Sequence, residues 1–344
     1  MAGSGTVRPF LPAPVARRTA RPVAALVAAV TAVAAAAALL AWWPAPPAGT
    51  PVPEGPVTVA TGVRSGVYER YGRMLKEDLR TDLPGVDVRL APSAGSVENI
   101  NMVASGRASF TLAAADAVAD YRGAGRDRLR ACARLYDDYL QLVVARSSTV
   151  RNARELRGLR VGVGQDGSGV NLIAERLLTA AGLHPTRDVE AVRVGIDRAP
   201  RMLEKGELDA FFWSGGLPTT AVSNLSQRFP IRLVQLGDLA EPLREQADGG
   251  RNHYRQAVMP GDAYPKAWPR GAAVPTVAVA NLLVTTDRVD AALTEQVTRT
   301  VIDSRDRIGE QVHAAQLVDL RTAIYTDPLP LHEGARRYYR SVKP

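Results

Sequence analysis

Short apolar runs rich in β-branched residues alternate with helical patterns of apolar positions from residue 57 onward. In the first stretch the runs predict three strands and the patterns predict two helices. The strands are expected at Val57–Thr61, Val86–Leu90 and Phe110–Ala115, and the helices at Val67–Leu79 and Val97–Ser105. Strands that alternate with helices in this way are typical of an α/β fold with parallel sheets.

The same order of elements recurs later in the chain. Ser65-Gly66-Val67 returns as Ser168-Gly169-Val170, 103 residues further along, and the helix-ending Gly106 returns as Gly206. The second set of strands is expected at Arg160–Val163, Val189–Val194 and Asp209–Trp213, with helices at Val170–Ala181 and Ala199–Lys205. A repeated βαβ unit predicts two α/β lobes and an inter-lobe cleft, because ligands of open parallel sheets lie where helix amino termini converge.

The remaining patterns predict how the chain passes between the lobes. Ser147–Arg157 is the expected first crossing, and Thr276–Thr285 is a buried strand that we expect to return to lobe I. Ile231–Leu236 predicts a further strand, and the amphipathic stretch Asp287–Gln311 predicts one long closing helix. We therefore assign residues 57–150 and about 276–344 to lobe I and residues 151–275 to lobe II.

The amino terminus has a different pattern, in three parts. Residues 1–22 contain four arginines and no acid, residues 23–43 form a 21-residue uncharged run, and residues 44–56 are rich in proline. A run of this length can span a bilayer, and the positive charges before it direct the following residues outward. A cleaved signal peptide is the alternative to a retained membrane anchor. In either case residues 57–344 are expected on the outer side of the cytoplasmic membrane.

The amino-acid composition argues against several classes of function. The 344 residues are 46% hydrophobic and 23% charged, as in ordinary globular proteins, and the net charge of +8 falls to +4 without the four amino-terminal arginines. The other arginines are spread among acids rather than grouped with aromatics, which argues against nucleic-acid binding. Cys132 has no second cysteine for a disulfide, and with the four histidines it lacks the spacing of a zinc site.

One familiar nucleotide-binding pattern is present. Gly162-Val163-Gly164-Gln165-Asp166-Gly167 is a literal G-x-G-x-x-G between a predicted strand and a predicted helix. Against a dinucleotide site, Asp166 would lie beside the pyrophosphate, and the next strand ends without the acid that binds ribose. No lysine follows the glycines, as a P-loop would require. We therefore expect no cofactor and no metal, and the G-x-S-x-G motif of hydrolases is absent.

Three small-residue turns stand at predicted helix amino termini. Free N–H groups and the helix dipole there favour a bound anion by about 0.3–1 kcal/mol. Each serine of these turns can equally be a helix cap, Arg64 a solvated turn residue, and Trp213 core or cleft wall. The candidate ligand-binding residues are Arg64, Ser65, Gly66 and Tyr68 in the first turn, Gly95, Ser96 and Asn99 in the second, Gly167, Ser168 and Gly169 in the third, and Gly216 in a later turn.

At these turns the chain resembles the TAXI family, the periplasmic solute-binding subunits of tripartite ATP-independent (TRAP) transporters. Residues 61–68 (TGVRSGVY) stand where the family has T-G-x-x-G-G-x-Y, and residues 93–99 (SAGSVEN) resemble its G-G-S-V-E-N turn. Leu159–Val170 resembles its strand followed by G-x-x-G-S-G-T. The resemblance implies a two-lobed, type II-like periplasmic-binding-protein fold, with two parallel or mixed sheets flanked by helices, that closes over a small carboxylate such as glutamate or a 2-oxoacid.

The resemblance also implies delivery of the ligand to a membrane permease driven by an ion gradient. The leading hypothesis is therefore an extracytoplasmic receptor without enzymatic activity, held at the membrane by its amino-terminal segment, with TRAP-type permease subunits as partners. Two alternatives stay open: a ligand sensor for a signalling partner, and an exported enzyme on the same scaffold. Turnover of a bound ligand would identify the enzyme.

We predict that residues 57–344, produced without the apolar run, form a soluble monomer. They have an ordinary composition and contain no other apolar stretch of membrane-spanning length. Size-exclusion chromatography with light scattering, in buffer without detergent, measures the mass. A requirement for detergent would contradict the prediction.

Overall fold

The computed structural model describes residues 53–246, 253–311 and 318–342. Residues 52–344 form one compact unit. The expected basic, apolar and proline-rich segments at 1–22, 23–43 and 44–56 lie outside the described residues, except for the last four positions. Within the described ranges, every helix is too short or too polar to cross a membrane.

The first βαβ unit forms parallel strands. β1 (Gly55–Ala60) pairs in parallel with β2 (Val86–Ala91) on one side and with β3 (Phe110–Ala114) on the other. Helix α2 (Val67–Asp82) connects β1 to β2, and α3 (Ser96–Ala104) connects β2 to β3. The strands and helices predicted for this region are confirmed, with ends that differ by no more than three residues.

The second unit repeats this arrangement. β5 (Arg160–Gly162) pairs in parallel with β6 (Glu190–Val192) and with β7 (Ala210–Gly215). Its helices are α5 (Gly169–Ala180) and α6 (Ala199–Glu204). These predicted elements are also confirmed, although β6 is shorter than expected. The repeat seen in the sequence is thus a repeat of structure.

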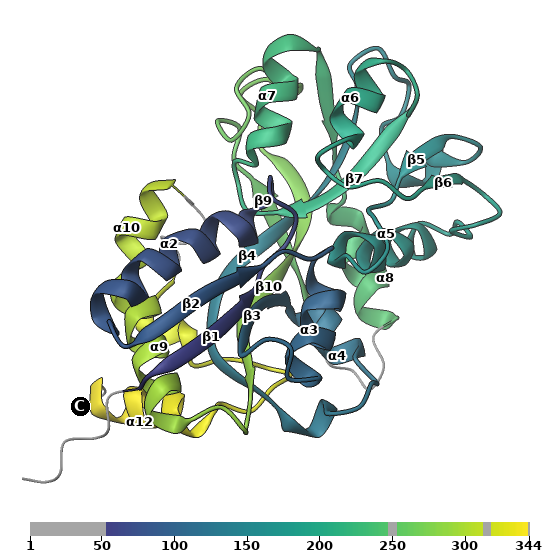
Figure 1. Ribbon diagram of the computed structural model, residues 1–344. Coiled ribbons are helices and arrows are strands. Elements are labelled where there is room, and N and C mark those ends of the chain that lie inside the picture. The colour runs from purple at the N-terminus through teal and green to yellow at the C-terminus, as the bar shows by residue number, and fades with distance from the viewer. Residues whose placement is uncertain (1–52, 247–252, 312–317, 343–344) are drawn as a thin grey trace, which may run out of the picture. The chain divides into compact units, whose positions relative to one another are not determined.

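Two long strands join the units into one mixed sheet. β4 (Leu129–Ala145) pairs antiparallel with β10 (Val274–Thr286) over its first part and with β7 and β8 (Ile231–Val234) over its second part. The strand order is β2-β1-β3-β10-β4-β7-β5-β6, with β9 (Tyr254–Met259) paired to β10. Figure 1 shows β4 and β10 running between the two groups of strands. The α/β fold class is confirmed, and the two expected sheets are continuous through this pair.

Helices cover both faces of the sheet. α2 packs with α9 (Ala291–Asp303) and α12 (Glu333–Val342) over β1, β2 and β4, where their buried residues form one apolar cluster. α6 and α7 (Thr220–Arg228) bury a second cluster against β7 and β8. The remaining helices are α4 (Ala115–Asp120), α8 (Ala240–Glu245), α10 (Arg305–Gln311), α11 (Leu320–Ala323) and the 3-10 turns Arg126–Arg128, Ala153–Leu156 and Gly237–Leu239.

The prediction of one helix over Asp287–Gln311 is wrong. α9 begins only at Ala291, because the Asp290 carboxylate caps it by accepting from Leu293 N at 2.9 Å. The helix then ends at Ser304, and α10 starts again at Arg305. The turn lets α10 pack on α2, where Arg307 forms an ion pair with Asp78. The apolar periodicity continues across this break and could not reveal it.

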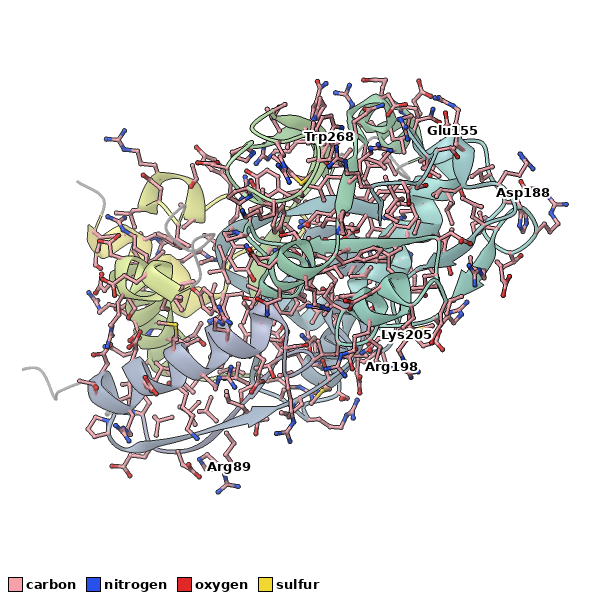
Figure 2. All side chains as sticks on the ribbon, turned by 90° about the horizontal axis from the view of Figure 1, so that it is seen from above. Arg89, Glu155, Asp188, Arg198, Lys205 and Trp268 are labelled. Carbon is pink, nitrogen blue, oxygen red and sulfur yellow. The ribbon has the colours of Figure 1, made fainter. Side chains whose placement is uncertain are left out.

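Charged side chains lie at the periphery. Arg89, Asp188 and Lys205 extend outward from the ribbon in Figure 2. They pair with near neighbours, as Arg89 does with Asp87 at 2.7 Å. Exposed pairs of this kind stabilise a fold by about 0–1 kcal/mol each. The apolar clusters under the helices are therefore the main source of stability.

Gly334 is required where α12 crosses α9. A Cβ at this position would overlap Ala291 O and lie 2.7 Å from Glu295 N. We predict that Gly334→Ala lowers the free energy of unfolding by about 1–3 kcal/mol, because the helices must separate. Urea denaturation measures the loss, and Arg340→Ala, on the exposed side of α12, is the control. Equal midpoints for the two variants would contradict the packing argument.

Candidate functional site

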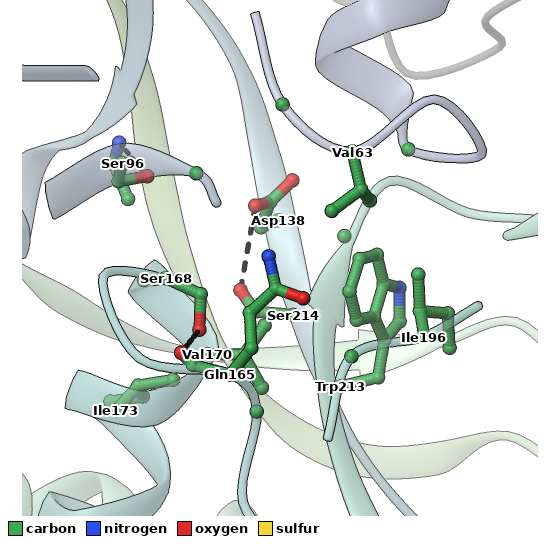
Figure 3. A pocket seen from close by; sticks show the side chains of 18 of the residues that line it. Val63, Ser96, Asp138, Gln165, Ser168, Val170, Ile173, Ile196, Trp213 and Ser214 are labelled. Atoms are coloured by element: carbon green, nitrogen blue, oxygen red, sulfur yellow. Dashed lines mark hydrogen bonds between the residues drawn. The ribbon is translucent and has the colours of Figure 1, made fainter. Parts of the chain in front are cut away.

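Three helix amino termini from the two βαβ units face one small cavity. They belong to α2, α3 and α5, and the cavity has a volume of about 70 Å³. Its wall combines backbone of the turns before these helices with side chains from β4, β7 and α4. In the view of Figure 3, Ser96 and Ser168 lie on one side of it, Trp213 and Ile196 on the other, and Asp138 and Ser214 between them.

The turns before α3 and α5 touch each other directly. Glu98 N donates to Gly167 O at 3.1 Å, and Gln165 Nε2 donates to Ala94 O at 3.2 Å. Gly167 has φ +77°, which favours glycine. A Cβ on Gly169 would lie 3.0 Å from the Ser96 hydroxyl oxygen. Small residues therefore allow the two turns to approach and close this side of the cavity.

Two of the three candidate serines, Ser96 and Ser168, use their hydroxyl groups within the protein. Ser168 caps α5, since its oxygen accepts from Asn171 N at 3.1 Å, and it donates to Gln165 O at 2.6 Å. Ser96 accepts from Ala114 N at 3.1 Å and bonds the Tyr68 hydroxyl at 3.0 Å. The helix-cap role considered for the serines is thus present at Ser168, and the donors left to face the cavity are backbone N–H groups of the first helical turns.

The Tyr68 hydroxyl extends this chain of hydrogen bonds to β10. It donates to Oδ1 of Asn281, a fully buried side chain. Burial, together with the negative charges of Asp138 and Asp116, raises the pKa of Tyr68 well above its usual range. Its hydroxyl therefore remains a proton donor at neutral pH. Since Oδ1 of Asn281 is occupied, the amide nitrogen of Asn281 is turned away from Tyr68.

The structure brings some of the predicted site residues together at the cavity and places others elsewhere. Arg64 and Ser65 are exposed at the tip of the first turn, outside the cavity wall. Asn99 is fully buried, where Nδ2 donates to Leu112 O at 2.9 Å. Gly167 and Gly216 also lie outside the wall. The predicted residues that line the cavity are Gly66, Tyr68, Gly95, Ser96, Ser168 and Gly169.

Sequence analysis did not single out the acidic part of the wall. Asp138 comes from β4, Asp116 from α4, and Ser214 from β7. A signal for Asp138 was present, because two consecutive acids, Asp137 and Asp138, interrupt an otherwise apolar run. Trp213 lines the cavity as well and donates from Nε1 to Thr219. Trp213 also packs against two apolar core clusters, so both roles considered for this tryptophan, core and cleft wall, are present.

An irregularity in the sheet lies beside Asp138. The pairing of β10 with β4 shifts register between Ala280 and Leu282, so that an extra residue of β4 stands opposite Asn281. Such bulges redirect side chains and occur beside functional sites. In the undistorted part next to the shift, Asp138 pairs with Val279 of β10.

The surroundings of Asp138 in the cavity wall change its acidity strongly. Burial raises its pKa to about 7, and the negative charges of Asp137 and Asp116 add to this effect. The Ser214 hydroxyl, 3.4 Å from Oδ2, and the Asn281 amide lower the pKa in part. Burial likewise raises the pKa of Asp116. The acidic part of the wall therefore changes its charge near neutral pH.

The chemistry of the wall is otherwise neutral. The described residues that line the cavity include no histidine, cysteine, lysine or arginine. Within the described ranges, no group of three or more His, Cys, Asp and Glu side chains is arranged to hold a metal ion. Val63, Ile196 and Trp213 provide an apolar wall opposite Ser96 and Ser168, at the amino termini of α3 and α5. Such a mixture of apolar surface and a few polar groups is typical of small-molecule sites.

The chain is similar to one protein family and to several solved structures. The model of the NMT1-like family matches residues 59–342. Similar solved structures include the alkanesulfonate-binding protein SsuA from Xanthomonas axonopodis pv. citri bound to MOPS, with 15% identity, TM-score 0.46, and 85% of this chain and 86% of that chain covered. The periplasmic aliphatic sulphonate binding protein SsuA from Escherichia coli has 14% identity, TM-score 0.44, and 85% and 80% coverage.

A third similar structure is an ancestral arginine-binding protein bound to arginine. It has 14% identity and a TM-score of 0.45, with 75% of this chain and 98% of that chain covered. Likenesses of this strength identify no ligand for the present chain.

We predict that the stability of Asp138→Asn, measured relative to the wild type, is higher at alkaline pH than at acidic pH. Asp138 titrates at about 7 in the folded protein and near 3.9 when unfolded. The folded state therefore holds a proton that the unfolded state loses, and the wild type loses up to about 4 kcal/mol as pH rises through this window. Thermal unfolding of both proteins without ligand, at pH 5 and pH 8, measures the effect. A constant difference in Tm would contradict it.

Proposed function

The chain belongs to the NMT1-like family, and on that premise we propose that it is an extracytoplasmic solute-binding protein. It binds a small carboxylate, such as a glutamate-like amino acid or a 2-oxoacid, in the cavity described above. It does not transform this ligand. It passes the ligand to the membrane subunits of a TRAP-type secondary transporter.

The observation that carries this proposal is the meeting of three helix amino termini at one cavity. The first N–H groups of α2, α3 and α5 have no partner within their helices, and the helix dipoles add positive potential there. A volume of about 70 Å³ holds roughly five to seven water-sized groups. A carboxylic acid of the size of pyruvate or alanine, with six non-hydrogen atoms, matches both the size and the potential, whereas a glutamate-like acid needs a wider cavity.

Contact between the α3 and α5 turns explains how binding is coupled to closure. The N–H groups come from both βαβ units, so a ligand contacts both sets only when Glu98 N reaches Gly167 O and the turns meet. A ligand shifts an equilibrium toward the state in which it makes more contacts. The ligand therefore stabilises the closed arrangement, which is the form offered to the transporter.

Two further features support delivery to a TRAP-type permease. The turns at residues 61–68, 93–99 and 159–170 resemble those of TAXI-type subunits. The uncharged run at residues 23–43, preceded by four arginines, is suited to export and to holding the protein at the outer face of the membrane. The residues that line the cavity would then face the compartment from which solutes are imported.

Calorimetric titration tests the function directly. L-glutamate, 2-oxoglutarate and pyruvate are added to the purified full-length protein, and the corresponding neutral amides serve as controls. We expect saturable binding of at least one acid and none of its amide, because the helix amino termini select negative charge. Equal affinity for an acid and its amide would contradict the proposal.

Gly169→Ala provides a test within the protein. The new Cβ would lie 3.0 Å from the Ser96 oxygen and 3.3 Å from its Cβ, so that the α3 and α5 turns must separate slightly. We predict a loss of affinity for the bound acid of roughly 5- to 100-fold, equivalent to about 1–3 kcal/mol of overpacking in the closed form.

Gly182→Ala is the matched control at the other end of α5. Gly182 has φ +75° and no atom near the position of a Cβ, so alanine there is strained but touches no part of the cavity. It should lower stability and leave the affinity unchanged. If Gly169→Ala also leaves the affinity unchanged, the contact between the turns has no part in binding.

A further inference from the structure

The cavity wall carries acids without matching cations. Among the described residues that line it, Asp116 and Asp138 are the carboxyl groups, and arginine and lysine are absent. Both are almost fully buried, with exposed fractions of 1% and 5%. A buried carboxylate without a cation or hydrogen-bond donors is strongly destabilising. The way in which each carboxyl is satisfied therefore indicates what the cavity accepts.

Asp116 is satisfied within the protein. Its Oδ1 accepts from Ala117 N at 2.8 Å, and its Oδ2 accepts from the Tyr254 hydroxyl at 2.9 Å. Arg176 donates to the same hydroxyl at 2.6 Å and brings a positive charge close to this pair. Asp116 therefore needs nothing from a ligand.

Asp138 is not satisfied. Its Oδ2 has a long contact of 3.4 Å with the Ser214 hydroxyl, and its Oδ1 has no hydrogen-bond partner among the described residues. The nearest arginines are engaged by the neighbouring carboxylate, since Arg134 and Arg255 donate to Asp137 at 2.8 Å and 3.0 Å. Asp138 lines the cavity, and one oxygen of its carboxyl has no donor among the described residues.

The amide nitrogen of Asn281 is also unpartnered. Although Asn281 lies near enough to lower the pKa of Asp138, its Nδ2 makes no hydrogen bond within the described residues. Tyr68 holds the oxygen of this amide, so the orientation of Nδ2 is fixed. Asn281 does not line the cavity, so the group that a donor on the ligand can satisfy is the carboxyl of Asp138.

We propose that the ligand carries a protonated amine that pairs with Asp138, so that the cavity selects amino acids over the 2-oxoacids and simple acids of the same carbon skeleton. This inference rests on the proposed function, in which the helix amino termini hold the carboxylate. The ammonium group then lies toward β4 and the carboxylate toward α3 and α5. An ammonium group supplies the positive charge and the donors that Asp138 lacks.

Matched ligand sets test this choice. The full-length protein is titrated near pH 8 with L-glutamate, 2-oxoglutarate and glutarate, and separately with L-alanine, pyruvate and propionate. We expect the amino acid of the preferred set to bind at least about tenfold more tightly than its two counterparts. If a 2-oxoacid or simple acid binds as tightly as the amino acid, the inference is overturned while the proposed function stands. If no member of either set binds, both are overturned.

The variant Asp138→Asn tests whether the carboxylate of Asp138 causes the preference for amino acids. It keeps the shape and removes the charge, so affinity for the amino acid should fall roughly 30-fold or more, while affinity for the 2-oxoacid should stay the same or rise. Asp127→Asn is the control: it removes a negative charge from an exposed residue that does not line the cavity. Its selectivity should equal that of the wild type. Unchanged selectivity in Asp138→Asn would overturn the inference even with a folded variant.

A metal cation paired with Asp138 is the competing explanation, and salt exchange distinguishes it. Each titration is repeated with choline chloride in place of sodium chloride. If an amine pairs with Asp138, the protein should prefer amino acids in sodium chloride and in choline chloride alike. If instead 2-oxoacids bind only with sodium, and Asp138→Asn abolishes that dependence, the site holds a cation and the amine proposal is wrong.

Discussion

β4 and β10 lie side by side in antiparallel register, and every other described strand joins the sheet through one of these two. β3 with β1 and β2 attaches to β10, whereas β7 with β5 and β6 attaches to β4. The register shift opposite Asn281 falls within this pairing, close to Asp138. The same interaction that makes one sheet from two βαβ units therefore also brings a carboxyl and an amide beside the cavity.

Local patterns predicted the parts of the fold in which each element has its own signal. The two βαβ units and their glycine-rich turns follow from alternating runs and helical spacing. β4 was not predicted, because Arg130, Arg134, Asp137 and Asp138 interrupt its apolar run, and because its long antiparallel pairing depends on β10, more than one hundred residues away. The break at Ser304 depends on packing against α2, and the apolar periodicity of the sequence carries no information about that packing.

The candidate site, like the fold, was predicted from the sequence only in part. Turns beside helix amino termini are visible in sequence, and several of their residues do line the cavity. What sequence could not show is how each polar atom is used. The hydroxyl groups of Ser96 and Ser168 bond within the protein, so the donors that we propose for the ligand are backbone N–H groups. Asp138, in contrast, has an oxygen with no partner, a property that only the arrangement of its neighbours can reveal.

The contact between the α3 and α5 turns, to which the proposed function assigns closure, is made largely by atoms that every amino acid possesses. Glu98 offers its backbone N–H, Gly167 and Ala94 offer carbonyl oxygens, and Gln165 is the single side chain that takes part. Mutations at wall residues away from the two turns, such as Asp138, therefore leave this contact in place. In the course of evolution, a duplicated gene can acquire a new cargo by changing a few wall residues while it inherits the contact between the turns intact. The residues that select the ligand and the contact between the turns can thus change at different rates in related proteins.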